Sequence, residues 1–469
     1  MSNNQTKTVR PFGWADKIGY AFGDFGNDFT FLMSSMFMLK FYTDVMGVPA
    51  AVVGTLMMVA RIVDAFTDVT MGQIVDRSKP TKDGKFKPWI RRMCGPVAIA
   101  SFMIFQSAFV DMSMTFKIVW MFVTYILWGS FFYTAVNIPY GSMASAISAD
   151  PNDRAQLSTF RTVGAVLASL VIGTVTPMFA YVVVDGATVL SGSRITIISG
   201  IFSVCAVICH MSCFHLVTER VEVPQNNTKF DAAKMLKSLV TNRSLLGIIA
   251  AAIMLLLAML GLGGMAPFIY PVYYNNSAAQ SASSFISNMA VLLICAPFAA
   301  KIAAKIGKRE LSIISCLFSA LVWVVCLFVR PASPWVYIGF YTLSYIGLGV
   351  FNTIIWAMIT DVIDDSEVKN GIREDGTIYA VYSFARKIGQ ALSSGMIGGL
   401  LGMIGYSSAV AANPSAYPEV LHSIFSLGCL IPAIGLGAVA LVLILIYPLS
   451  KSRVDANVAE LAKRRANKA

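Results

Sequence analysis

Charged residues are scarce in this sequence. Asp, Glu, Lys and Arg together make up 13% of its 469 residues, about half the share of roughly 25% that is usual in soluble proteins. A soluble chain of this length would need several charged domain surfaces. The shortage of charge therefore excludes a soluble enzyme, and the 56% of apolar residues excludes a disordered chain and a small secreted scaffold.

Motifs of nucleotide and hydrolase chemistry are also absent. The patterns GxxxxGK[ST], HExxH and GxSxG do not occur. None of the eight cysteines has metal-ligand spacing to a histidine, and all of them lie within or beside apolar stretches, which is typical of buried apolar residues rather than disulfides. The first 28 residues contain no continuous apolar segment of a signal peptide. We expect neither enzymatic activity nor a cofactor.

Apolar stretches long enough to cross a bilayer recur along the whole chain. We predict membrane helices at residues 17–43, 49–74, 91–111, 117–144, 157–184, 194–217, 243–274, 283–305, 309–330, 335–360, 377–406 and 420–448. The pattern predicts an all-α integral membrane protein with twelve transmembrane helices.

The basic residues lie mainly in short loops. Seven Lys and Arg residues fall within residues 76–92, whereas the loops around Gly47, Gly186 and Asn276 contain almost none. The positive-inside rule then predicts a multi-pass protein of the cell inner membrane with both termini in the cytoplasm. The same rule accounts for the net charge of +11, so we expect no nucleic-acid partner.

The chain divides into two sets of six predicted helices. We expect an N-terminal six-helix bundle over residues 1–217, a cytoplasmic central loop over 218–242, a C-terminal six-helix bundle over 243–448 and a cytoplasmic tail over 449–469. The fifth helix of each half carries Arg-x-x-Gly, beginning at Arg161 and at Arg386. Two parallel six-helix repeats are the layout of the major facilitator fold.

The second predicted helix carries charges at membrane depth, where they are costly and often functional. Arg61, Asp64 and Asp68 lie three and four residues apart, on one helical face. Two carboxylates so placed repel each other unless one takes a proton or a cation lies between them. Thr67 adds a hydroxyl nearby, so the pattern favours a site for Na⁺ or H⁺. Structural pairing of Arg61 with Asp64 is the alternative.

The first predicted helix has an aromatic and acidic face. Tyr20, Asp24, Asn27, Asp28 and Phe31 share it. Carboxylates accept hydrogen bonds from sugar hydroxyls and rings cover the C–H side of a sugar, so this face suits a sugar. Asp28 is the deeper acid and the expected ligand, whereas Asp24 is either a ligand or the partner of a basic residue.

Three further helices offer polar groups at membrane depth. Thr134 and Asn137 share a face of the fourth helix, and either ligand contact or bonding between helices fits them. Arg161, Arg386 and Lys387 can balance the acids or hold substrate oxygens. We assign no role to the histidines, and we expect Asp361, Asp364, Asp365 and Glu367 to form salt bridges at a cytoplasmic loop or gate.

At these residues the sequence resembles the glycoside–pentoside–hexuronide:cation symporter family, a branch of the major facilitators. The matching stretches are Gly23–Phe29, Phe41-Tyr42-Thr43-Asp44, Ala60–Ala65 with Asp68, Gly84-Lys85-Phe86-Lys87-Pro88-Trp89, Asn137-Ile138-Pro139-Tyr140-Gly141-Ser142, Asp361–Asp364 and Arg386–Ala391. The Gly84–Trp89 loop and the acids of the second helix are the most diagnostic.

The resemblance implies roles for individual residues. It assigns the cation, and the metal if that cation is Na⁺, to Asp64 and Asp68, with Thr67 and Thr134 as neutral ligands. It assigns sugar binding or coupling to Asp28, Arg161 and Lys387, in a cavity that is also lined by Tyr133, Tyr382 and Ser383. We add Asn137 to the predicted sugar site because it is a polar group at membrane depth. The melibiose carrier has an acid at the position of Asn137 and a Trp at that of Gly141, which argues against an α-galactoside.

The function that these observations imply is cation-coupled symport, with Na⁺ or H⁺, of a glycoside, pentoside or hexuronide by alternating access. The alternatives are a carrier of the same fold for a lipid or another amphiphile, and a sugar exporter or exchanger. A membrane enzyme would usually need a larger loop outside the membrane. We expect the sugar, a monovalent cation and membrane lipid as partners, and a monomer.

Overall fold

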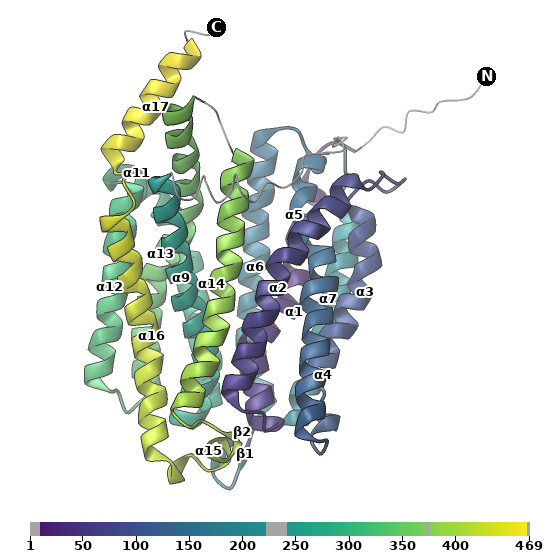
Figure 1. Cartoon of the computed structure of the whole chain (residues 1–469), viewed down its shortest axis with the longest axis vertical. Helices are drawn as coiled ribbons and strands as arrows, with labels where there is room; N and C mark the ends of the chain where they lie inside the picture. The colour runs from purple at the N-terminus through teal and green to yellow at the C-terminus, as the bar shows by residue number, and fades with distance from the viewer. Residues whose placement is uncertain (1–9, 222–241, 372–374, 467–469) are drawn as a thin grey trace, which may run out of the picture. The chain divides into compact units, whose positions relative to one another are not determined.

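The computed structural model describes residues 10–221, 242–371 and 375–466. These residues are almost entirely helical (Figure 1). The first part of the chain forms α1 (Trp14–Lys40), α2 (Ala50–Arg77), α3 (Lys87–Ile104), α4 (Met114–Ile126), α5 (Thr134–Ile147), α6 (Pro151–Ala180) and α7 (Gly192–Leu216). The later part forms α9 (Arg243–Phe268), α10 (Ser277–Ala290), α11 (Ala296–Ile306), α12 (Lys308–Val329), α13 (Pro334–Asn370), α14 (Asp375–Met403), α15 (Ser408–Ala412), α16 (Pro418–Leu445) and α17 (Lys451–Ala466).

Short wide π-helical turns extend or join several of these helices. They are η1 (Phe41–Val45) after α1, η3 (Leu127–Tyr133) between α4 and α5, η4 (Ile269–Tyr273) after α9 and η5 (Val291–Cys295) between α10 and α11. Two 3₁₀ turns, η2 (Ser107–Phe109) and η6 (Pro414–Ala416), lie in loops. The predicted single span 117–144 is thus α4, η3 and α5 in sequence, and π turns of this kind frequently occur at functional sites.

Ten helical segments of the described chain are long and apolar enough to cross a membrane. The segments α1 and α14 are not among these ten, yet they coincide with the predicted spans 17–43 and 377–406. Both carry charged residues within their length. The prediction of a multi-pass helical membrane protein is confirmed, whereas the number twelve stays a prediction.

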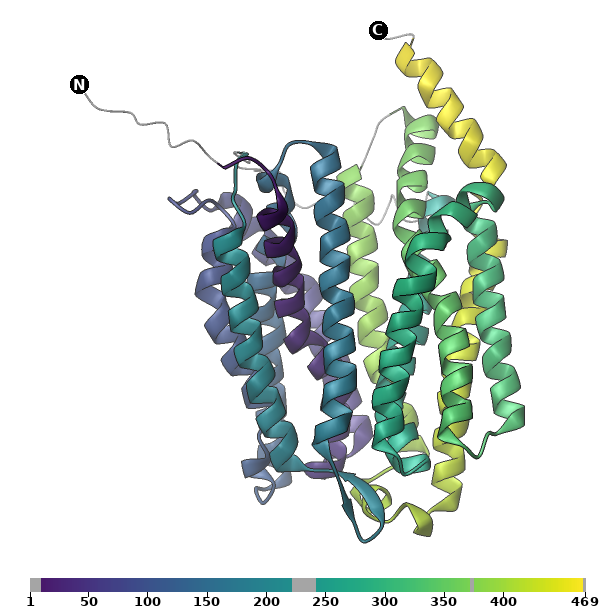
Figure 2. The ribbon, with the colours of Figure 1, turned by 180° about the vertical axis from the view of Figure 1, so that it is seen from behind.

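One element differs from the prediction. The fifth span was expected to continue to residue 184, but α6 ends at Ala180 and is followed by an antiparallel hairpin of β1 (Tyr181–Val184) and β2 (Ala187–Leu190) (Figure 2). Asp185 and Gly186 form the two-residue turn with positive φ angles of 49° and 82°. An Asp-Gly pair between runs of β-branched residues is a strong hairpin signal. Residues 181–184 therefore form a strand of a hairpin and do not continue the apolar helix.

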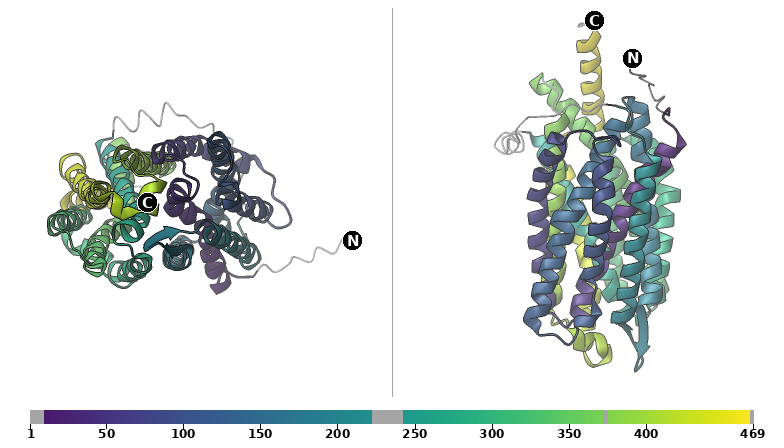
Figure 3. Two further views of the ribbon diagram at one scale, coloured as in Figure 1. Left: turned by 90° about the horizontal axis from the view of Figure 1, so that it is seen from below. Right: turned by 90° about the vertical axis from the view of Figure 1, so that its right-hand side faces the viewer.

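The chain forms two compact units, which are Met1–Ser34 with Phe66–Ile172 and Ile195–Lys229, and Ser35–Ala65 with Gly173–Arg194 and Phe230–Ala469. In the second unit α9 packs against α14 and α16, and α12 packs against α13 and α16. Figure 3 views the helices end-on. The predicted bundle boundaries at residues 217 and 243 stay a prediction.

In the first unit the loop Gly84–Trp89 is held by Glu219. The backbone N–H groups of Lys85, Phe86 and Lys87 donate to its carboxylate at 2.7–2.9 Å. Gly84 has a φ of +110°, and an added Cβ would lie 2.5 Å from the same carboxylate. An anion is stabilised at a helix N-terminus, so this loop motif anchors the start of α3 to the segment that follows α7.

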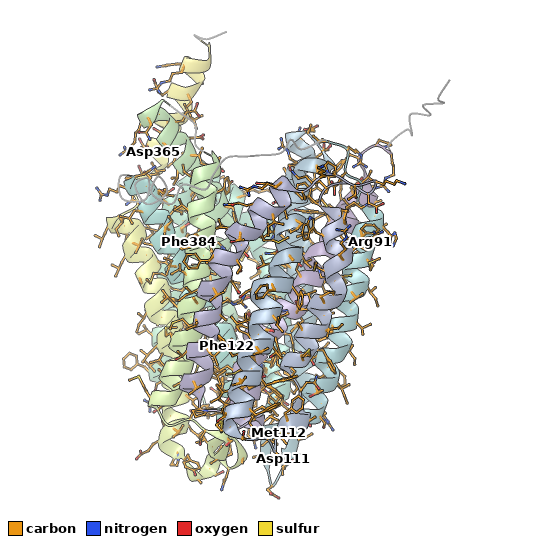
Figure 4. The ribbon with its side chains drawn as sticks, turned by 45° about the vertical axis from the view of Figure 1, so that its right-hand side comes forward. Arg91, Asp111, Met112, Phe122, Asp365 and Phe384 are labelled. Carbon is orange, nitrogen blue, oxygen red and sulfur yellow. The ribbon has the colours of Figure 1, made fainter. Side chains whose placement is uncertain are left out.

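In the second unit Asp365 joins three helices at one end of α13, where Figure 4 labels it. Ser244 Oγ of α9 and Asn457 Nδ2 of α17 donate to its carboxylate at 2.6 and 3.2 Å. Lys369 forms an ion pair with it, and Lys308 forms one with Asp361 at 2.6 Å. The salt bridges expected at this loop are therefore present at Asp361 and Asp365.

Candidate functional site

In the first unit Asp24 and Arg161 form an ion pair. Arg161 Nε lies 3.0 Å from Asp24 Oδ1, and the guanidinium lies 5.5 Å from the centre of the Tyr140 ring. Gly23 and Gly164 make this approach possible, because an added Cβ would lie 2.2 Å from the Tyr140 ring or 2.4 Å from the Ala21 carbonyl oxygen. Asp24 is thus the partner of a basic residue, one of the two roles that were left open for it.

Asp28 lies one helical turn beyond Asp24 and is half-buried. Within the described ranges, its carboxylate makes no hydrogen bond or ion pair. A carboxylate at membrane depth is stable only with hydrogen bonds, a countercharge or a proton, so Asp28 has acceptor capacity for a ligand.

The neighbouring Asn27 contacts a histidine to which the sequence assigned no role. Asn27 Oδ1 lies 3.1 Å from His210 Nε2, and both residues are buried. Gly26 lets α7 come close, because an added Cβ would lie 3.1 Å from the His210 ring. The pair holds α1 against α7 and so fixes the helix that carries Asp28.

The acids of α2 have different partners. Arg61 Nη1 lies 3.2 Å from Asp64 Oδ2, and both side chains are buried. In the first unit Thr134 Oγ1 donates to Asp68 Oδ1 at 2.8 Å. Thr67 is half-buried in the same helical turn as Asp68. The structure therefore brings together Asp68 and Thr134, two of the predicted cation ligands, and it also contains the Arg61–Asp64 pair that was the structural alternative.

Tyr133 stands at the junction of η3 and α5 in the first unit. Its ring centre is 5.8 Å from that of Phe31 and 5.4 Å from that of Trp128. Asn137 follows one helical turn later on the same face and is half-buried. Tyr133 and Asn137 therefore lie one helical turn apart, and Trp128 packs against Tyr133. That both residues contact a sugar stays a prediction.

In the second unit Tyr382 and Arg386 meet a residue that the sequence did not single out. The Arg386 guanidinium lies 5.4 Å from the centre of the Trp356 ring and 5.9 Å from that of Tyr382. Trp356 is 47% exposed. Ser383 is exposed and Lys387 is half-buried. A tryptophan in an apolar helix has no distinguishing sequence signal, so only its contact with Arg386 identifies it.

A second group that the sequence missed lies at the other end of α14. Lys40 Nζ forms an ion pair with Asp44 Oδ2 and donates to the Tyr406 hydroxyl at 2.7 Å. The Tyr406 hydroxyl donates to Asp44 Oδ1 at 2.8 Å. Lys40 is 1% exposed. The spacing of Lys40 and Asp44, one helical turn apart, was the available signal.

Close helix crossings surround this triad within the second unit. An added Cβ on Gly54 would lie 2.6 Å from the Gly398 Cα atom, so α2 and α14 touch through their backbones. The Ser281 hydroxyl of α10 donates to the Thr174 carbonyl of α6 at 2.8 Å. Small residues allow such approach in membrane helices. All these contacts lie at the ends of the helices that the topology predicts to be extracellular.

The hairpin adds a polar contact at the same end. The Thr188 N–H donates to Asn275 Oδ1 at 2.6 Å, and Asn275 Nδ2 donates to the Gly186 carbonyl at 2.7 Å. Asn275 adopts a φ of +52°, a conformation that asparagine tolerates better than most residues. The hairpin is thereby fastened to the segment between η4 and α10.

No group of three or more His, Cys, Asp or Glu residues that could hold a metal ion occurs in the part of the chain that the structure describes. Hard oxygen ligands suit monovalent and other hard cations. The carboxylates of α2 with the Thr134 hydroxyl offer such oxygens, and the assignment of a cation to them stays a prediction.

Comparison with known proteins agrees with the predicted resemblance. A family model described as MFS/sugar transport protein matches residues 19–451. A glucuronide carrier protein homolog of Escherichia coli (strain K12) is 30% identical over 460 residues, 96% of each chain. A second protein of that strain, which carries the provisional name of a glycoside/cation symporter, YagG, is 31% identical over 464 residues, 96% of this chain and 95% of the relative.

A solved structure shares the fold. The D-xylose-proton symporter aligns with a TM-score of 0.61 at 13% sequence identity, over 92% of this chain and 97% of that chain. The predicted major facilitator fold is thereby confirmed.

Proposed function

Because this chain belongs to the MFS family of sugar transport proteins, we propose that it carries out cation-coupled symport of a sugar by alternating access. The observation that carries this proposal is the hydrogen bond of 2.8 Å between Thr134 and Asp68. It sets an acid and a hydroxyl together at membrane depth, where oxygen ligands suit Na⁺ or H⁺. The names of the relatives support the coupling of a sugar to a cation.

The α2 acids supply the coupling. Asp64 and Asp68 lie one helical turn apart in a water-poor site, where two carboxylates need compensating charge or protons. Arg61 Nη1 lies 3.2 Å from Asp64 Oδ2 and compensates part of this charge. A bound cation removes the repulsion between the two carboxylates and makes the site less negative. Ion and sugar then raise each other's affinity by the same factor. Asp28, Tyr133 and Asn137 supply sugar contacts from the first unit.

The contacts at the predicted extracellular end supply one closed gate. The Gly54–Gly398 crossing and the Lys40–Asp44–Tyr406 triad join helices of the second unit at this end, and we assign the gate to them. Alternating access requires these contacts to separate when the carrier opens outward. The sugar and the cation would then enter from outside and leave after the contacts re-form.

The test is uptake of radiolabelled sugars into proteoliposomes under separate Na⁺ and pH gradients. The wild type accumulates sugar under one gradient, and preloaded sugar accelerates entry by counterflow, which a channel does not do. Asp64→Asn and Asp68→Asn abolish gradient-driven accumulation but retain part of the exchange. Asp111→Asn is the control, because Asp111 is exposed in the loop before α4 (Figure 4). Full accumulation in both variants of α2 contradicts the coupling.

The orientation has its own test. We propose an inner-membrane carrier with both termini in the cytoplasm, in agreement with the basic loop at residues 76–92. A cysteine at Ser277 then reacts with an impermeant maleimide added to intact cells, and a cysteine at Lys82 does not. Reaction of both positions from the same side contradicts this topology.

A further inference from the structure

Arg386 is a charge deep within the predicted membrane region of the second unit. It lies about 16 Å along the α14 axis from Asp375, at 1.5 Å per residue. A charge at this depth usually faces the bundle interior or water and has a partner. Arginine keeps its charge in proteins. Arg386 therefore needs water or a partner and cannot become neutral by losing a proton.

Three other basic residues at membrane depth form ion pairs with acids. Arg161 pairs with Asp24, Arg61 with Asp64, and Lys40 with Asp44. Arg386, by contrast, forms no ion pair with an acid within residues 10–221, 242–371 and 375–466. It contacts the aromatic residues Trp356 and Tyr382.

These aromatic contacts hold the guanidinium without neutralising it. The Trp356 and Tyr382 rings lie 5.4 and 5.9 Å from it, and Arg386 Nη1 donates to the Tyr382 hydroxyl at 3.4 Å. A guanidinium has five N–H donors, so most of its donors stay available. The side chain is half-buried, and the neighbouring Trp356 is 47% exposed. The charge is therefore oriented and accessible.

We propose that Arg386 binds an acidic group of the sugar, so that the preferred substrate is a hexuronide rather than a neutral glycoside. A carboxylate matches the planar guanidinium through two parallel hydrogen bonds and supplies the missing negative charge. The depth of Arg386 sets it apart from the phosphate groups of lipids at the bilayer surface. This inference rests on the proposed function, because it names the substrate of the same carrier.

The test uses two matched pairs of probes, methyl β-D-glucuronide with methyl β-D-glucoside, and methyl β-D-galacturonide with methyl β-D-galactoside. The members of each pair differ at C6, which carries a carboxylate or a hydroxymethyl group. Binding to the purified full chain is measured by calorimetry with saturating cation. The wild type binds at least one uronide more tightly than its neutral partner. Arg386→Gln weakens the binding of that uronide about 30-fold or more and leaves the affinity for the neutral sugar unchanged.

Two further variants keep the result interpretable. Arg386→Lys keeps the charge but loses the planar fork, so its affinity for the uronide falls between those of the wild type and Arg386→Gln. Arg330→Gln changes an exposed arginine that follows α12 and leaves both affinities unchanged. Thermal unfolding of each variant shows whether it is folded.

The outcomes separate this inference from the proposed function. Tighter binding of both neutral sugars by the wild type, or an equal loss of uronide and neutral sugar in Arg386→Gln, overturns the role of Arg386 and leaves sugar symport standing. Absence of cation-stimulated uptake for all four probes overturns symport of these sugars and the inference with it.

Discussion

Two groups of charges at membrane depth differ in how completely the protein satisfies them. Lys40, Asp44 and Tyr406 form a closed triad in which each side chain contacts the other two. Asp28 is half-buried, and no described residue is recorded as a hydrogen-bond or ion-pair partner of its carboxylate.

The difference separates structural charges from those that are open to a ligand. A complete polar network stabilises one arrangement of helices, and breaking it is costly. An incompletely satisfied group gains most when a ligand supplies the missing partner. In the proposed mechanism the triad keeps one end of the second unit closed, and Asp28 and Arg386 bind the substrate.

Lys40→Met is the largest predicted perturbation of the triad. The substitution leaves the Asp44 carboxylate buried with only the Tyr406 hydroxyl, so the free energy of unfolding falls by about 3–5 kcal/mol. Denaturant unfolding of the purified protein in detergent measures this change. Replacing both charges, Lys40→Met with Asp44→Leu, recovers most of the loss. Unchanged stability in the single variant means that the triad is not structural.

Asp28→Asn tests whether the carboxylate of Asp28, which has no hydrogen-bond or ion-pair partner among the described residues, binds the sugar. The substitution removes the charge but keeps the shape, so sugar affinity falls by about 10- to 150-fold, which corresponds to about 1.5–3 kcal/mol, while stability stays the same. Calorimetry and thermal unfolding measure the two effects. Asp24→Asn is the matched variant, because it deprives Arg161 of its partner and therefore lowers stability. Wild-type sugar affinity in Asp28→Asn removes this residue from the site.

Gly54→Ala tests whether the contact between Gly54 and Gly398 belongs to a gate. The added methyl group meets the α14 backbone at Gly398, which disfavours the closed arrangement by about 1–3 kcal/mol and shifts the population by about five- to 150-fold. Spin labels at Pro49 and Ser408 report a longer distance when this end opens. Gly437→Ala is the control, since an added Cβ there meets nothing within 4 Å. An unchanged distance distribution refutes the gate.

Tyr406→Phe is expected to change the free energy of unfolding least. It removes the hydroxyl that bridges Lys40 and Asp44 but keeps their ion pair, so stability falls by about 1–2 kcal/mol. Thermal unfolding measures the shift beside that of Tyr417→Phe, which changes an exposed tyrosine. A loss as large as that of Lys40→Met means that the hydroxyl, rather than the ion pair, holds the triad.

Helical periodicity predicted which polar residues share a face but not which helices would meet. Thr134 and Asn137 lie three residues apart in α5 and so share a face, as expected. Thr134 was expected beside Asp68 only through the family resemblance, and the structure contains that hydrogen bond. Asp24 had two possible roles, and the contact with Arg161, 137 residues away, selected one of them.

The hairpin shows where composition misled the prediction. Val182, Val183 and Val184 extend an apolar stretch and were therefore assigned to a membrane helix. The turn at Asp185 and Gly186 reverses the chain instead. The Asp-Gly turn signal is present in the sequence, and it decides the local structure although the apolar run continues to Val184.

The sequence by itself determined the class of this protein, because apolar length, loop charge and the scarcity of membrane charge act along the chain and need no partner. It also marked Asp28, Asp64, Asp68 and Arg386 as unusual, since a charge at membrane depth is costly wherever its helix packs. Only the tertiary structure decided which charges are neutralised. Lys40 meets Tyr406 across 366 residues, and Arg386 meets aromatic rings of Trp356 and Tyr382. Pairing depends on distances between helices, which a one-dimensional pattern does not contain.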